Sequence, residues 1–223
     1  MSARLLLQPC REALGRGLKV QEPLIEQAII EARGMRRDDL AEVLAFGIWL
    51  YLSYGATVKA RRLATEFWNI SWLTRRSFEI GVLKAMVKPG SRLLRFADLL
   101  ASRSINEANG EPGGFVAVPS LIAVRAAVSL LRKKVTAGLA LSEATIDPDH
   151  FDFETMRLLA EALAVVHKTG HLTTGKIRKH LRLFKYIQTH QELLCSPQLW
   201  EFSRAIGEVS EQRTPCSTKH EKR

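Results

Sequence analysis

Apolar side chains recur at steps of three and four residues along most of the chain, which is the period of a helix buried on one face. The clearest example is 119–136, where Leu121, Val124 and Val128 share a face. The same pattern predicts helices at residues 3–16, 22–33, 38–53, 57–68, 72–87, 91–102, 119–136, 152–168, 174–190 and 197–210. We therefore expect a mainly α, multi-helix fold, and no internal repeat is visible in the sequence.

Two segments rich in turn-forming residues interrupt this pattern, 104–114 and the acidic stretch 144–152, and both are predicted loops. Residues 104–114 form a predicted loop between an N-terminal helical region (1–103) and a C-terminal helical region (115–213). Residues 214–223 are polar and have no apolar period, so we predict a disordered tail there. The single β-like stretch is 114–118, for which we predict one short strand.

The overall composition is that of an ordinary globular protein, since 46% of the 223 residues are hydrophobic and 25% are charged. The most apolar stretch, 43–54, is well short of the roughly 20 residues that a membrane-spanning helix needs. The apolar run near the N-terminus is too short for a secretory signal. Three widely spaced cysteines form no ligand cluster, which predicts no bound zinc. We expect a soluble, cytoplasmic protein without a membrane span.

Positive charge collects in two places along a chain of net charge +10. Residues 55–103 contain 10 Lys and Arg against 3 Asp and Glu, and residues 166–190 contain 6 against none. The segment 137–165 has the opposite balance, with 1 against 6. Basic charge that is clustered in this way favours a polyanionic partner, and we expect double-stranded DNA.

The first basic segment, Lys59 to Phe78, resembles the helix-turn-helix of bacterial repressors. Leu63-Ala64 corresponds to the Leu-Ala pair of the first helix, Asn69-Ile70-Ser71 to the turn, and Trp72 to Val87 to the recognition helix. Ser71 would cap that helix by accepting a bond from a free backbone N–H. The resemblance implies a transcriptional regulator, and recognition of two half-sites implies a homodimer.

The resemblance also assigns roles to individual side chains. The residues implied in nucleic-acid binding are Lys59, Arg61, Arg62, Thr74, Arg75 and Arg76. The basic residues of the first helix would hold phosphates, whereas Arg75 or Arg76 would bridge O6 and N7 of a guanine in the major groove.

The second basic segment is predicted to be a helix, 174–190, capped by Thr173 or Thr174. Its predicted phosphate-binding residues are Lys176, Arg178, Lys179 and Arg182. The start of this segment, 170–177, nearly matches a nucleotide phosphate loop. Ile177 replaces the Ser or Thr that would bind Mg²⁺, so we predict no nucleotide binding.

Two alternatives to the helix-turn-helix remain open. The strand at 114–118 followed by a helix resembles the order of elements in ribbon-helix-helix DNA-binding dimers. A protein of another class, a helical adaptor or scaffold in a larger assembly such as a secretion or conjugation system, would use its basic faces to bind acidic proteins. No catalytic pairing of side chains is recognisable, and we predict no enzyme activity, no cofactor and no metal.

Overall fold

The computed structural model describes residues 2–112, 114–146, 152–190, 193 and 196–211. Within these residues the fold contains twelve helices and no strand, which confirms the mainly α class. The helices are α1 (Ala3–Gly15), α2 (Glu22–Ala32), α3 (Arg37–Ser53), α4 (Thr57–Trp68), α5 (Trp72–Met86), α6 (Leu94–Asn109), α7 (Gly114–Leu131), α8 (Val135–Glu143), α9 (Phe153–Lys168), α10 (Thr174–Lys179), α11 (Leu181–Thr189) and α12 (Pro197–Glu211).

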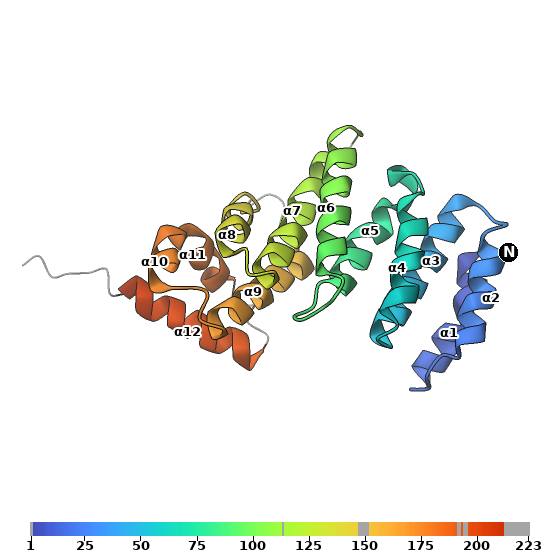
Figure 1. The fold of residues 1–223 in the computed structure, drawn as a ribbon, viewed down its shortest axis with the longest axis horizontal. Helices are drawn as coiled ribbons and strands as arrows, with labels where there is room; N and C mark the ends of the chain where they lie inside the picture. The colour runs from blue at the N-terminus through green and yellow to red at the C-terminus, as the bar shows by residue number, and fades with distance from the viewer. Residues whose placement is uncertain (1, 113, 147–151, 191–192, 194–195, 212–223) are drawn as a thin grey trace, which may run out of the picture.

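The helices are stacked in two rows, and as far as α9 the chain alternates between the rows (Figure 1). The odd-numbered helices α1, α3, α5, α7 and α9 contact one another in sequence. Each even-numbered helix from α2 to α8 packs against an odd-numbered neighbour, and α12 packs against α9, α10 and α11. Among the described helices, extensive contacts join only those within three places of each other, so the stack is elongated.

The central helix of the stack is α7, which packs against α5, α6, α8 and α9. Leu121, Val124 and Val128, the face predicted from the apolar period, have no exposed surface. Of the described helices, α7 is the one long and apolar enough to cross a bilayer, and 50% of that stretch is buried inside the fold. Contact with four neighbouring helices accounts for its apolar character.

The loops that lead from an odd-numbered helix to the next even-numbered helix share one backbone geometry. Each of the five such loops from α1–α2 to α9–α10 contains one residue with a left-handed φ between 63° and 73°, and these residues are Gly17, Gly55, Gly90, Lys133 and Gly170. In four of the five loops, the next residue donates a backbone hydrogen bond to the carbonyl five positions earlier, as Ala56 does to Tyr51 at 2.8 Å. This is the Schellman ending of a helix. The hairpins thus repeat in structure although the sequence shows no repeat.

The stretch 114–118, predicted as a strand, instead forms the N-terminal part of α7. A lone strand would leave its backbone N–H and C=O groups without partners, whereas a helix bonds its own. The ribbon-helix-helix alternative is wrong for the same reason, because it requires that strand. The predicted loop at 104–114 is shorter than expected, since α6 continues to Asn109.

Two predicted helices differ from the structure at a break. The helix predicted at 119–136 ends earlier, at Leu131, before the left-handed turn at Lys133, and α8 after that turn was not predicted beyond residue 136. The helix predicted at 174–190 is divided into α10 and α11 at His180. In both cases the apolar period continues across the break, so it gave no sign of one. The predicted disordered tail at 214–223 and residues 147–151 of the predicted loop at 144–152 lie outside the described residues.

Candidate nucleic-acid interface

The helix-turn-helix segment forms two helices joined by a short turn. The first helix, α4, ends at Trp68 and the second, α5, begins at Trp72, as the pattern predicts. Both helices pack mainly against α3 and only lightly against each other. The Ser71 hydroxyl lies 3.0 Å from the Thr74 hydroxyl and bonds no backbone N–H of α5, so the predicted cap is wrong.

Arg75, a predicted base reader, is buried between α5 and α6 and is 1% exposed. Its guanidinium donates hydrogen bonds to the Ile70 carbonyl and to the carboxylates of Glu79 and Glu107. Burial raises the pKa of the Glu79 carboxyl, although Arg75 and a serine hydroxyl oppose this effect. The assignment of Arg75 to base reading is therefore wrong, because its donors are already bonded inside the fold.

The basic residues of α4 are held by neighbouring helices. Lys59 forms ion pairs with Glu22 and Glu26 of α2, and its Nζ lies 3.4 Å from Oε1 of Glu26. The guanidinium of Arg61 lies over the ring of Phe96 in α6, 5.1 Å from its centroid. These contacts bridge successive even-numbered helices, so the two side chains contribute to packing as well as charge.

Three predicted site residues of this segment are less constrained. Arg62 is exposed and borders a groove of about 210 Å³ between α2 and α4, with Ile29 and Tyr51 in its lining. Thr74 is half-buried and Arg76 is exposed. Neither Arg62 nor Arg76 forms an ion pair within the described part of the chain.

A second ion pair between α2 and α4 makes stability depend on pH. Arg33 donates two hydrogen bonds of 2.9 Å to Glu66, and these bonds lower the pKa of the Glu66 carboxyl. A carboxyl with a lowered pKa in the folded state stabilises the fold above its unfolded pKa, and the effect is lost as the pH falls through the folded value.

We predict that Glu66→Gln lowers the free energy of unfolding by about 0.2–1 kcal/mol at neutral pH, as expected for an exposed ion pair. The difference from the wild type should shrink as the pH falls through the folded pKa of Glu66, because both proteins are then neutral at this position. Urea unfolding of both proteins at a series of pH values measures this difference in the free energy of unfolding. A difference that is constant across the series would contradict this assignment.

The second basic segment forms two short helices rather than one. Thr173 caps α10, as predicted, by accepting a bond from the backbone N–H of Lys176 at 3.5 Å. The ring of His180 lies at the junction with α11 and is 3.1 Å from Glu143 of α8. The element before this segment is the helix α9, so 170–177 lacks the strand that a nucleotide phosphate loop follows.

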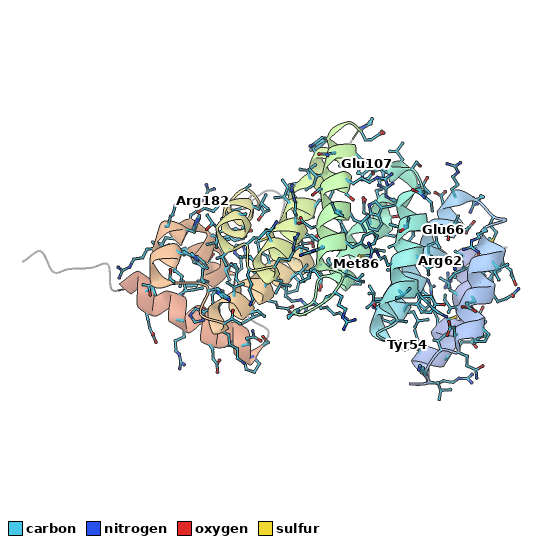
Figure 2. All side chains as sticks on the ribbon, in the orientation of Figure 1. Tyr54, Arg62, Glu66, Met86, Glu107 and Arg182 are labelled. Atoms are coloured by element: carbon cyan, nitrogen blue, oxygen red, sulfur yellow. The ribbon has the colours of Figure 1, made fainter. Side chains whose placement is uncertain are left out.

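The predicted phosphate-binding residues of this segment differ in exposure. Lys176 is half-buried, and its Nζ donates to the His171 carbonyl at 3.0 Å. Arg178 is also half-buried, whereas Lys179 and Arg182 are exposed. Figure 2 shows Arg182 at the upper border of the C-terminal part of the stack.

One exposed lysine was not among the predicted site residues. Lys185 follows Arg182 by three residues on α11 and is exposed like it. The opposite face of α11 is buried through Leu183, Phe184 and Ile187. The spacing of three residues on a helix places Lys185 beside Arg182, so the sequence contained the signal that identifies it.

Comparison of the chain with known protein families, curated proteins and solved structures gives no match. Within the described residues, no group of three or more His, Cys, Asp or Glu side chains is placed to hold a metal ion. The interpretation of the site therefore depends on its charge, exposure and hydrogen bonding.

Proposed function

We propose that this protein binds double-stranded DNA through phosphate contacts made by α10 and α11. The contacts come from exposed side chains on the solvent face of these helices, above all Lys179, Arg182 and Lys185. Binding of this kind does not depend on base sequence, because phosphates are the same at every position.

The observation that supports this proposal is the lack of ion pairing in this segment. No carboxylate lies within 4 Å of Lys179, Arg182 or Lys185 in the described parts of the chain. In contrast, Lys59 is neutralised by Glu22 and Glu26. Unpaired cations on a helical face are free to replace the counterions of a phosphate backbone, and release of those ions is what drives such binding.

Recognition of a specific operator has weaker support in this fold. With Arg75 buried, Arg76 and Thr74 are the remaining residues of α5 that the helix-turn-helix resemblance placed against bases. A regulator that reads an operator, and the homodimer that would read two half-sites, remain predictions from the resemblance.

We predict that affinity for a random-sequence duplex of roughly 20 base pairs, two helical turns, falls steeply with salt between about 50 and 200 mM. Each phosphate contact contributes about 0.9 to the log–log slope. The triple variant Lys179→Ala, Arg182→Ala, Lys185→Ala should therefore reduce the slope by about 2–3 and weaken binding at every salt concentration. Fluorescence anisotropy of labelled DNA measures both quantities.

Lys59→Ala is the control for this experiment, because Lys59 is already ion-paired and its loss should leave the slope unchanged. The wild type should bind tightly at the lowest salt concentration. If the wild type shows no detectable binding at the lowest salt concentration, and its circular dichroism spectrum shows that it is folded and helical, the proposal is refuted.

A helical adaptor is the second candidate function. The feature that favours it is the groove between α2 and α4, whose lining combines Ile29, Ile30 and Tyr51 with charged side chains at the rim. A groove between helices with an apolar floor and charged rim suits a protein segment better than a phosphate backbone. This candidate predicts that the wild type does not bind DNA.

A further inference from the structure

Five described loops join an odd-numbered helix to the next even-numbered helix, from α1–α2 to α9–α10, and none of them contains Asp or Glu; three of them, α1–α2, α5–α6 and α7–α8, carry Lys and Arg. We call this side of the stack the basic edge. Its exposed cations, which form no ion pair among the described residues, are Arg16, Lys19, Lys88, Arg92, Lys133 and Lys134. The arginines of the α2–α3 loop, on the opposite edge, are instead paired: Arg33 with Glu66 and Arg36 with Asp39.

Contacts place these loops next to one another along the stack. Lys19 of the first loop lies 5.1 Å from the ring centroid of Tyr54, which begins the second loop. Arg132, before the fourth loop, pairs with Asp98 in the second turn of α6. In Figure 1 the loops α1–α2, α3–α4 and α5–α6 lie along the lower edge.

The end of α9, which leads into the fifth loop, lies beside the third and fourth loops. A groove of about 260 Å³ is lined together by Pro89, Leu131 and Val165, which belong to the α5–α6 loop, the end of α7 and the last turn of α9. Packed helices lie about 8–10 Å apart, so the three steps from the first loop to the fourth, which hold the cations, extend over roughly 30 Å. That length is close to one turn of duplex DNA, about 34 Å.

Lys133 distinguishes the fourth loop from the others. It adopts a φ of 63°, where the other four loops have glycine, and Lys134 donates the Schellman bond to Ser129 at 2.9 Å. A side chain in this conformation is strained, because its Cβ crowds the backbone. Glycine would relieve the strain but would remove a cation from the edge. Strain retained at one position of a repeated motif indicates a function for the side chain.

We propose that the basic edge is an extended track for the phosphate backbone of double-stranded DNA, which lies along the stack across successive loops. This inference rests on the proposed function and adds a second surface to it. The first three loops of that surface lie along the lower edge in Figure 1, whereas Arg182 lies at the upper border in Figure 2. A single strand fits less well, because binding of single strands uses exposed aromatic rings to stack bases. The ring at this edge, Tyr54, is already bonded to the Val20 N–H and covered by Lys19.

The test compares two variants of equal charge change. The edge variant carries Arg16→Ala, Lys88→Ala, Arg92→Ala and Lys134→Ala. The control carries Arg33→Ala, Arg36→Ala, Lys59→Ala and Arg103→Ala, whose side chains are ion-paired. Anisotropy with duplexes of about one and two helical turns should show a log–log salt slope lower by about 3–4 in the edge variant alone. The wild type should gain affinity with duplex length, and the edge variant should lose that gain.

Lys133→Gly supplies a second, independent readout. It should raise the melting temperature by about 2–4 °C through relief of strain, and it should weaken DNA binding several-fold. A variant that binds DNA weakly because it is partly unfolded would have a lower melting temperature, so unfolding cannot explain a raised melting temperature together with weaker binding. An unchanged affinity in Lys133→Gly, or equal losses in the edge and control variants, would overturn the track.

The outcomes separate this inference from the proposed function. If the wild type binds and the edge variant keeps its full slope while the α10–α11 triple variant loses binding, the track is wrong and the proposed function holds. If the wild type does not bind at all, the proposed function itself is wrong.

Discussion

Arg75→Ala should lower the free energy of unfolding by about 3–5 kcal/mol, the largest effect that we expect from one substitution in this protein. Its guanidinium is buried and bonded to Glu79 and Glu107. Removing it leaves the Glu79 carboxyl, 2% exposed, with a serine hydroxyl as its remaining side-chain donor. A buried carboxylate without its cation is costly because water no longer solvates it. Chemical denaturation followed by circular dichroism measures the change.

Arg76→Ala is the matched control, because Arg76 is the next residue on the same helix and is exposed. It should change stability by no more than about 0.5 kcal/mol. The double variant Arg75→Met, Glu79→Gln should cost less than Arg75→Ala, since it removes both charges together. Similar stabilities of Arg75→Ala and Arg76→Ala would show that Arg75 is not buried in solution and would restore it as a candidate base reader.

Gly138→Ala should destabilise the protein by about 1–3 kcal/mol, although alanine is the better helix former. A Cβ at Gly138 would lie 2.7 Å from Cγ of Leu130 and 3.1 Å from the backbone nitrogen of the same residue. These distances are shorter than atomic contact allows, so α7 and α8 would have to separate. Both helices belong to the central part of the stack, where a shift disturbs several neighbours.

The same substitution at Gly81 should have the opposite sign. This residue lies within α5, and a Cβ there would meet nothing within 4 Å. Gly81→Ala should therefore stabilise the protein by about 0.5–1 kcal/mol through helix propensity. Thermal denaturation of the two variants side by side tests the pair, and an equal shift in both would mean that α7 and α8 are not closely packed.

The sequence predicted most helices within a few residues of where they lie, because burial of one face produces a period that is visible locally. Residues 57–68, for example, coincide with α4. The period did not predict the breaks at Lys133 and at His180, because the spacing of apolar residues continues across both breaks. The prediction also failed at 114–118. Phe115 and Val116 are apolar but exposed, so the apolar residues of this stretch do not mark the buried face of a strand.

The basic side chains show a different limit of sequence reasoning. Arg75 and Arg76 are adjacent, of the same type and within one helix, yet the first is buried and the second is exposed. Arg75 is bonded to Glu79 on its own helix and also to Glu107, which belongs to another helix and is 32 residues away. No local pattern records such a partner.

The sequence by itself determined the helical class, most helix positions and the excess of positive charge, because each of these depends on composition or on neighbours within one or two turns. The tertiary structure decided which cations are neutralised, which are exposed and which lie in one line. Lys19 and Lys133 are far apart along the chain, and they share the basic edge because consecutive helices are antiparallel and every second loop returns to the same side. That arrangement follows from packing between helices, a property that no single segment carries.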